Sequence, residues 1–567
     1  AASSSRQRRI VRGSVASHEA LLNVLFASNA GEIPPIVPPL SPRAVPPLRE
    51  GAMLGLREFL GGPCERVLPQ MSDVSTAPRM QGAGQVSVTP TILMGLLGSI
   101  LVMAGSYGVG WLAMSSPINR WKWLVPWRTE FSGLICATIV LTIGAWMLVG
   151  AWLALGRKLR PWGSSLKPLI VATAVWSLPL MFAAPIFSRD VFAYIGQGRI
   201  VAGGGNPYEL TISSMNNWLQ LGADATWAES QTAYGPLFYW IAAAVVSVTG
   251  VATEPAIFGF RILAWLGIIL LIVYVPKLAA VHGVNPVKAT WYAVANPVVL
   301  LSFIASAHND ALMVGLAVAA TYYAARRQGV LAIVLLVASV GIKPITLVLL
   351  PYLGLLWAGP ASSWPRKIRY WAYSAVLAVA LLALMGLPGH FGFGWIQATL
   401  AAGGGYYNFY APLGAVVAGS TALLTVLSLD GSWVLGAVQK LGRLAALIVI
   451  AITLFRGSYR HLVQRLLIGF SALVVLSPVI HPWYLLWLLP FFAATGIRDD
   501  WQALWMYVSV GFFVALGCFD QLFVWQFFAH LKGVLQVISI GVSVLAFVLI
   551  AWVIPPTKAM FADTLKP

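Results

Sequence analysis

The chain contains few charged residues, and acids are especially scarce. Only 10% of its 567 residues are charged, with 18 Asp and Glu against 36 Lys and Arg. A soluble globular domain has about 25% charged residues, so this composition excludes an ordinary soluble protein. Hydrophobic residues instead make up 59% of the chain, and the mean hydropathy is +0.80. Most of the chain therefore lies in a lipid bilayer.

The chain is also poor in cysteine. Its three cysteines, Cys64, Cys136 and Cys518, have no metal-ligand spacing, and two of them lie in apolar runs. Neither a zinc site nor a disulfide framework follows from this pattern, and we expect small packing residues. The sequence also lacks a DxD-like motif for a divalent metal. It therefore predicts no metal and no cofactor.

Basic residues outnumber acids, and the net charge of +18 is in principle compatible with nucleic-acid binding. The basic residues gather, however, in short loops between apolar runs, at 157–160, 326–327, 366–369 and 456–465. An excess of Lys and Arg in short loops marks the cytoplasmic side of a membrane protein. We therefore expect the lipid bilayer as a partner and no nucleic acid.

Apolar runs of membrane-spanning length recur along the chain. A helix needs about 20 apolar residues to cross the hydrocarbon core, and the runs lack the alternation of β-barrel strands. The sequence predicts an all-α polytopic membrane protein with about 13–15 membrane segments by this length criterion. If every apolar segment crossed the membrane, the loops would alternate between its two sides, and some basic loops would lie outside. We therefore expect some segments to be re-entrant, entering and leaving the membrane on the same side. The Lys343-Pro344 pair in the run 329–358 predicts two short helices that meet at a polar point.

Residues 1–89 are rich in Pro, Ser and Arg and form a separate tail. Such a composition cannot build a packed core, so we expect disorder, while residues 90–567 form the membrane domain. The tail has no convincing signal peptide. Its first methionine is Met53, and an over-extended reading of the gene is one interpretation of this segment.

One polar loop, residues 188–236, separates two apolar runs and carries four of the chain's few acids: Asp190, Glu209, Asp224 and Glu229. The basic stretch 156–167 precedes the run that leads to this loop, which places the loop on the extracytoplasmic side. Asp190 follows that run closely, and an acid in this position is a candidate for function. It can act as a general base toward a hydroxyl; a cap of the following helix is the alternative.

Three more residues of this loop are candidates for substrate binding. Arg189 can pair with an anionic group, or it can lie among lipid headgroups. Tyr208 follows a Gly-rich turn and can stack on a ligand. Tyr234 precedes the Gly-Pro pair at which the chain re-enters the membrane. A purely structural role in these turns is the alternative for both tyrosines.

Polar residues also interrupt the apolar runs further along the chain. His308, Asn309 and Asp310 stand together in an apolar region, where polar groups line a cavity or pair with one another. Polar contacts between helices are the alternative. Lys343 is isolated in its run and suits a phosphate group, or it pairs with Asp310 or Asp190.

A further imidazole lies at the end of the apolar run 462–480. His481 is followed by Trp483 and Tyr484, aromatic residues that can bind a sugar or form part of an interfacial belt. Together, the candidates offer a general base, cations for a phosphate and aromatic rings for a sugar. They indicate transfer from a lipid phosphate to a hydroxyl acceptor.

The same residues belong to an ordered set of longer motifs. These read SRDVFAYIGQGRIVAGGGNPY, TAYGPLF, NPVVLLSFIASAHNDALMVGLAVA and SPVIHPWYLLWLLP, with Lys343-Pro344 between the last two. The set resembles the polyprenol-phosphomannose-dependent α-1,6-mannosyltransferases, actinobacterial enzymes of the GT-C superfamily that extend the mannan core of lipomannan. The resemblance runs from residue 91 to the C-terminus.

The resemblance implies a GT-C-type multi-helix transmembrane fold in the plasma membrane, with the catalytic acid on an extracytoplasmic loop. Carried onto this sequence, that acid is Asp190. The donor is then a β-linked mannose on polyprenyl phosphate, and displacement inverts it to an α-glycoside on an extracytoplasmic glycan or glycolipid. The motif positions that look like the rest of the pocket are His308, Asn309, Asp310, Lys343 and His481.

Two other functions fit parts of the sequence. A GT-C transferase of a different unit, such as arabinose or a whole glycan, has a similar architecture. A transporter or flippase of lipid-linked sugars also has broken helices with charges at the membrane midplane. The lack of an internal repeat and the concentration of acids in one loop argue against the transporter.

Overall fold

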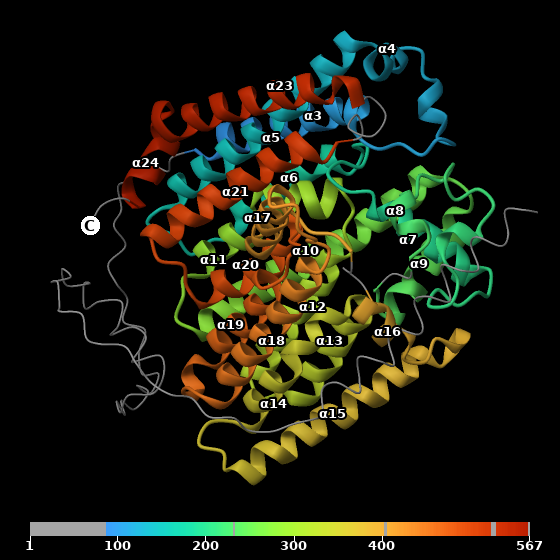
Figure 1. Cartoon of the computed structure of the whole chain (residues 1–567). Coiled ribbons are helices and arrows are strands. Elements are labelled where there is room, and N and C mark those ends of the chain that lie inside the picture. Colours follow the sequence, from blue (N-terminus) through green and yellow to red (C-terminus); the bar gives the residue numbers. More distant parts are fainter. Residues whose placement is uncertain (1–86, 231–232, 402–404, 523–528, 565–567) are drawn as a thin grey trace, which may run out of the picture. The chain divides into compact units, whose positions relative to one another are not determined.

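The computed structural model describes residues 87–230, 233–401, 405–522 and 529–564. Every regular element within these ranges is a helix (Figure 1). The prediction of an all-α protein is therefore confirmed. Residues 1–86, which contain Cys64 and nearly all of the tail predicted to be disordered, lie outside the described residues.

Within the described residues, seven helical segments are long and apolar enough to cross a membrane. An eighth candidate is a pair bent by 117°, made of the π-helix η3 (Val299–Ala305) and helix α12 (Asp310–Ala325). The chain is therefore a multi-pass membrane protein. The seven are α3 (Thr89–Val109), α5 (Phe131–Leu159), α10 (Thr253–Val281), α15 (Trp364–Gly386), α18 (Val434–Phe455), α21 (Trp501–Asp520) and the segment formed by α23 (Ala529–Val548) with the π-helix η8 (Leu549–Val553).

In the same described ranges, six further apolar helices have only 10–17 residues. The sequence analysis expected about 13–15 segments because it counted long and short apolar runs alike. The run 329–358 folds as two helices, as predicted, because Pro344 has no N–H with which to continue α13. The short helices are α6 (Lys167–Leu180), α9 (Pro236–Thr249), α13 (Gly329–Ile342), α14 (Leu350–Ala358) after the 3-10 turn η4 (Pro344–Leu349), α17 (Pro412–Val426), and α20 (Leu485–Thr495) after the 3-10 turn η7 (Pro482–Tyr484).

The polar loop 188–236 is itself partly helical. It begins with α7 (Asp190–Ala202), which packs against α9 (Figure 1). The remaining described α-helices connect or flank the longer ones: α4 (Leu124–Thr129), α8 (Ala225–Ala228), α11 (Pro286–Ala293), α16 (Gly394–Ala401), α19 (Leu462–Val475) and α24 (Pro555–Thr564). Short 3-10 helices lie in the connections: η1 (Pro117–Arg120), η2 (Ile212–Ser214), η5 (Pro388–His390) and η6 (Tyr459–His461).

Helices α10 and α12 approach each other closely because glycine stands where they cross. A Cβ atom on Gly267 would lie 2.1 Å from the carbonyl carbon of Ala311, and one on Gly315 would lie 2.7 Å from the carbonyl oxygen of Gly267. Small residues allow this backbone contact between membrane helices. Since Ala311 follows Asp310, the contact fixes the start of α12, next to the polar residues predicted to form a site.

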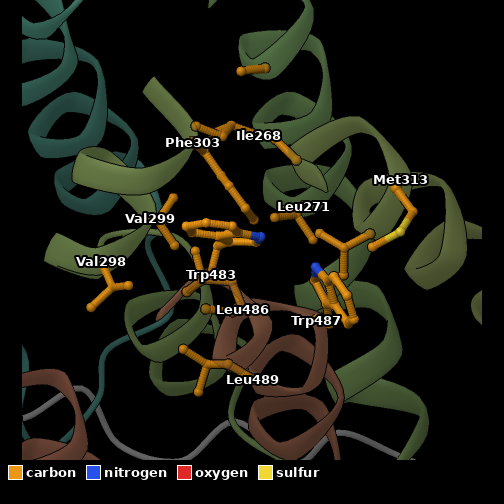
Figure 2. Close-up of a cluster of buried hydrophobic side chains, with 14 of the residues drawn as sticks. Ile268, Leu271, Val298, Val299, Phe303, Met313, Trp483, Leu486, Trp487 and Leu489 are labelled. Atoms are coloured by element: carbon orange, nitrogen blue, oxygen red, sulfur yellow. The ribbon is translucent and has the colours of Figure 1, made fainter. Parts of the chain in front are cut away.

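A cluster of buried apolar side chains joins five of these elements (Figure 2). It draws residues from α10, η3, α12, η7 and α20, so segments far apart in the sequence pack around one centre. Trp483 and Trp487 belong to this cluster and also border the polar residues described below. Its other labelled members are Ile268, Leu271, Val298, Val299, Phe303, Met313, Leu486 and Leu489.

Ion pairs tie several basic loops together. Asp499 lies 3.2 Å from Arg160 and 2.8 Å from Lys288. Asp563 of α24 lies 2.9 Å from Arg157 and 3.1 Å from Arg160. These contacts bring the basic end of α5, the start of α11 and the loop after α20 together on one side of the protein.

Candidate active site

Asp190 is the first residue of α7, and Arg189 is the N-cap residue of this helix. The backbone N–H of Asp190 donates a hydrogen bond to Ser188 Oγ at 3.1 Å, which shapes the turn into the helix. The side chain of Asp190 is 21% exposed. Its carboxylate is therefore within reach of a ligand.

His308 lies between two carboxylates. Its Nδ1 atom is 3.6 Å from Asp190 Oδ2 and 3.6 Å from Asp310 Oδ2. The side chains of His308 and Asp310 are fully buried. One edge of the imidazole thus faces both acids, and the segment before α12 meets the start of α7.

Lys343 compensates the charge of the buried Asp310. Its Nζ atom lies 2.9 Å from Asp310 Oδ1, and the indole N–H of Trp487 donates to the same oxygen at 2.6 Å. A buried carboxylate is stable only with such partners. The structure thus contains the Lys343–Asp310 pair that the sequence offered as one alternative.

Aromatic rings surround this cluster. The ring centroid of Trp483 lies 4.0 Å from that of His308, and Trp483 stacks on His481 at 4.5 Å. Tyr484 stacks on Trp487 at 3.9 Å. The aromatic residues that follow α19 therefore line the polar cluster, which a belt at the membrane surface alone would not require.

Tyr194 is a member of the cluster that the sequence analysis missed. Its hydroxyl donates to Asn309 Oδ1 at 3.3 Å and lies 3.5 Å from His308 Nδ1. Tyr194 is four residues after Asp190, so both side chains lie on one face of α7. This spacing is the signal that could have identified it. Trp487, also missed, follows Trp483 at the same spacing.

Arg189 is engaged within its own loop. Its Nη1 atom lies 3.1 Å from Asp224 Oδ2, and its Nη2 donates to the carbonyl of Gly222 at 2.8 Å. The guanidinium also lies 4.5 Å from the ring centroid of Trp111. These contacts stabilise the loop, and the predicted role of Arg189 in substrate binding stays a prediction.

The two predicted tyrosines lie in different places. Tyr208 is buried, and its hydroxyl donates to the backbone carbonyl of Tyr234 at 2.8 Å. The ring centroid of Tyr234 lies 5.6 Å from Lys343 Nζ and 5.4 Å from the ring of Tyr194. Tyr234 therefore borders the cluster, whereas Tyr208 supports it through the backbone.

A buried arginine of α10, Arg261, joins the two halves of the site, and the sequence analysis missed it. Its Nε and Nη2 donate to the carbonyls of Ile304 at 2.9 Å and Ala305 at 2.6 Å, and its Nη1 donates to Met181 at 2.9 Å. The first two residues precede His308, and the third precedes the segment that leads to α7. A single Arg inside an apolar span was the available signal.

Burial changes the acidity of Asp190, which lies outside the membrane-spanning helices. Removal from water raises its pKa from the ordinary 3.8 to about 6. The positive charge of Lys343 lowers this pKa, and the negative charge of Asp310 raises it further. Asp190 can therefore exchange a proton close to neutral pH.

Among the residues that the structure describes, no group of three or more His, Cys, Asp or Glu side chains can hold a metal ion. The expectation of a reaction without metal stays a prediction. Of the two described cysteines, Cys136 is exposed and Cys518 is buried, and both are free thiols.

The fold and the site define an integral membrane protein with an acid–base cluster where its apolar helices break. Residues 92–359 match the family model "Alpha-(1->6)-mannopyranosyltransferase, N-terminal domain", and residues 410–546 match the model "MptB C-terminal domain". Together, the two matches cover well over half of the chain. The chain belongs to the alpha-(1->6)-mannopyranosyltransferase family and is a glycosyltransferase enzyme.

Individual relatives agree with this assignment. A "Probable alpha-(1->6)-mannopyranosyltransferase" of Mycolicibacterium smegmatis is 28% identical over 474 residues, which cover 76% of this chain and 83% of the relative. An alpha-(1->6)-mannopyranosyltransferase of Mycobacterium tuberculosis is 29% identical over 475 residues, which cover 73% of this chain and 79% of the relative. The family predicted from the motifs is confirmed, and an enzyme is favoured over a transporter.

Proposed function

We propose that this enzyme transfers a mannosyl unit from polyprenyl-phosphate mannose to a hydroxyl of an extracytoplasmic glycan or glycolipid. The product has an α-1,6 linkage, and the anomeric carbon inverts. Family membership supports the mannosyl unit and the linkage. A lipid phosphate as donor is supported by a site that lies among membrane helices and contains a cation.

The proposal rests on the difference between the two carboxylates of the site. Asp190 is 21% exposed, whereas Asp310 is 0% exposed and paired with Lys343. Of these two acids, only Asp190 can approach an acceptor hydroxyl. Its pKa of about 6 suits a general base, which must be ionised at the working pH and still accept a proton.

In the proposed step, Asp190 takes the proton of the acceptor hydroxyl while the hydroxyl oxygen bonds to the anomeric carbon. The bond from that carbon to the phosphate oxygen breaks, and its electron pair leaves with the lipid phosphate. Lys343 holds this phosphate, because an ammonium has three N–H donors and Asp310 occupies one of them at 2.9 Å. Attack opposite the phosphate inverts the sugar.

Unsatisfied polar atoms in the site support a sugar ligand. The indole N–H of Trp483, Nε2 of His308 and the amide nitrogen of Asn309 are buried without a hydrogen-bond partner among the described residues. Nearly all buried polar groups in proteins have such partners. The hydroxyls of a bound sugar can supply them, with His481, Tyr484 and Tyr234 as the aromatic surroundings.

The proposed orientation follows from the helices that lead away from the site. Helices α12 and α20 have 16 and 11 residues, or about 24 and 16 Å at the rise of an α-helix. Helix α12 ends at the basic pair Arg326-Arg327, which marks the cytoplasmic side, and the loop after α20 is joined to Arg160 and Lys288 through Asp499. The hydrocarbon core is about 30 Å thick. We therefore place the site toward the outer side of the membrane, within reach of an outer-leaflet lipid phosphate.

The test is the transfer of labelled mannose from polyprenyl-phosphate mannose to a synthetic α-mannoside by the full chain in detergent. We expect Asp190→Asn to lower kcat by about 10²–10⁴-fold, the range that a general base contributes. Glu209→Gln is the matched control, because Glu209 is an exposed acid of the same loop that accepts a hydrogen bond from Asn206.

The control variant should retain the wild-type rate. Near-wild-type transfer by a normally folded Asp190→Asn protein would contradict the proposed base. Detergent also separates the enzyme from a flippase, because transfer needs no sealed bilayer.

A further inference from the structure

A cavity of about 200 Å³ lies apart from the proposed active site. One wall comes from the end of α14 and the start of α15, and the other from the end of α18 and the start of α19. Helix α14 packs against both α15 and α19 (Figure 1). Lys367 and Arg465 are the charged residues of the lining, and Trp364, Phe455 and Tyr459 are aromatic.

The two wall segments carry only one sign of charge. Residues 355–369 and 454–465 contain no Asp or Glu. The ion pairs that the described residues form all involve other cations. An anion is therefore the ligand that this electrostatic field favours. The basic residues of the two segments are Arg366, Lys367, Arg369, Arg456, Arg460 and Arg465.

The two cations of the lining have different roles. Arg465 is buried and donates to four backbone carbonyls around the end of α18, those of Thr453, Leu454, Gly457 and Ser458. It therefore shapes one wall. Lys367 is only partly buried, and its Nζ lies 4.7 Å from the ring centroid of Trp364. Lys367 is the cation that can turn toward a ligand.

Exposed apolar side chains border the cavity. Helices α15 and α18 are the least buried of the seven candidate spans. Only 17% of the residues in an apolar 18-residue stretch of each helix are buried. Trp364, Ile368 and Phe455 at the adjoining helix ends are exposed. Exposed apolar residues on membrane helices contact acyl chains, and Trp is enriched at the level of the headgroups. A lipid can therefore place its headgroup in the cavity and its chains along α15 and α18.

We propose that this cavity binds the phosphate headgroup of an anionic membrane lipid. Lys367 contacts the phosphate, and Trp364 and Phe455 pack against the part of the lipid next to the headgroup. The lipid links the α14–α15 wall to the α18–α19 wall on the basic side of the membrane. This site is independent of the donor and acceptor proposed above.

The test measures the melting temperature of the full chain in detergent during titration with short-chain phosphatidylglycerol. We expect a rise in Tm with this lipid, and none with short-chain phosphatidylcholine or inorganic phosphate at equal concentration. Lys367→Gln should weaken the apparent affinity by about tenfold, through the loss of one hydrogen bond to a charged group. Ser362→Phe, which fills the cavity and keeps every cation, should abolish the rise.

Lys277→Gln is the matched control. Lys277 also lies over an aromatic ring, with its Nζ 5.2 Å from the ring centroid of Tyr274, but it does not line the cavity. This variant should bind the lipid as wild type does. Equal weakening by Lys277→Gln and Lys367→Gln would mean diffuse attraction to the basic side and would overturn the proposal. Unchanged affinity in Lys367→Gln, or the same rise with inorganic phosphate alone, would also overturn it.

Discussion

The ammonium of Lys343 lies 2.9 Å from the fully buried carboxylate of Asp310. Lys343 directly follows α13, and Asp310 is the first residue of α12, so this ion pair joins the ends of two apolar helices. Each charge compensates the other in a region with little access to water. The pair therefore fixes the position of the cation that we propose for the phosphate.

Removal of Lys343 alone should destabilise the protein. Lys343→Met leaves Asp310 buried without its cation, and breaking a buried pair in this way costs about 3–5 kcal/mol. We expect a lower unfolding temperature in detergent. The double variant Lys343→Met/Asp310→Asn lacks both charges and should regain most of the stability, yet stay inactive in mannosyl transfer. A single variant as stable as wild type would show that the pair does not support the fold.

Activity should depend on the ionised form of Asp190. Because burial raises the pKa of Asp190 to about 6, the base is protonated below that pH, and kcat/KM should fall about tenfold per pH unit there. Lys343 lowers this pKa and Asp310 raises it. The acid limb should therefore move to higher pH in the residual activity of Lys343→Met and to lower pH in that of Asp310→Asn. A profile without an acid limb excludes Asp190 as the titrating base.

Arg261 should position the two halves of the site. Arg261→Gln loses bonds to Ile304, Ala305 and Met181, and misplacement of reacting groups by about 1 Å can cost about 10²-fold in rate. We expect a loss of this size in kcat, with a shifted acid limb, because Asp190 then sits differently relative to His308. The pH dependence of kcat in the folded variant is the measurement.

Arg465→Gln provides the control for this variant. Arg465 is also a buried arginine that donates to backbone carbonyls, but those carbonyls lie around the end of α18. Its loss should lower the stability and leave kcat per folded molecule unchanged. Equal losses of kcat in both variants would mean that Arg261 acts only through global stability.

The crossing of α10 and α12 should tolerate no side chain at Gly267. Gly267→Ala places a Cβ atom 2.1 Å from the carbonyl carbon of Ala311, so the start of α12 must move. We expect a marked loss of transfer activity and of stability. Gly419→Ala in α17 is the control, because a Cβ atom there has no neighbour within 4 Å. Wild-type activity in Gly267→Ala would contradict a fixed α10–α12 contact.

The sequence predicted the features that depend on local composition. Apolar runs identified the membrane helices, and His308 and Asp310 stood out because polar groups are costly in lipid. The break at Lys343-Pro344 followed from the missing N–H of proline. Each of these inferences needs only a short stretch of sequence.

Pairings across the chain could not be predicted in the same way. Trp487 bonds to Asp310 across 177 positions, a contact that exists only because α20 packs beside α12. The contacts of Arg189 with Asp224 and Gly222 likewise join positions more than 30 residues apart, and they leave its expected role in substrate binding a prediction. The sequence analysis missed Arg261 because one cation barely lowers the mean hydropathy of a long apolar helix.

Chemical rescue of Asp190 tests the proposed mechanism most directly. Asp190→Ala should lose transfer from polyprenyl-phosphate mannose, and added formate should restore part of the rate, because a small carboxylate can accept the proton in place of the missing side chain. Asp310→Ala should not be rescued, since Asp310 is buried and acts through its pair with Lys343. Rescue of Asp190→Ala alone is the expected result. Full transfer by a folded Asp190→Ala protein without formate would contradict the role of Asp190 as the base.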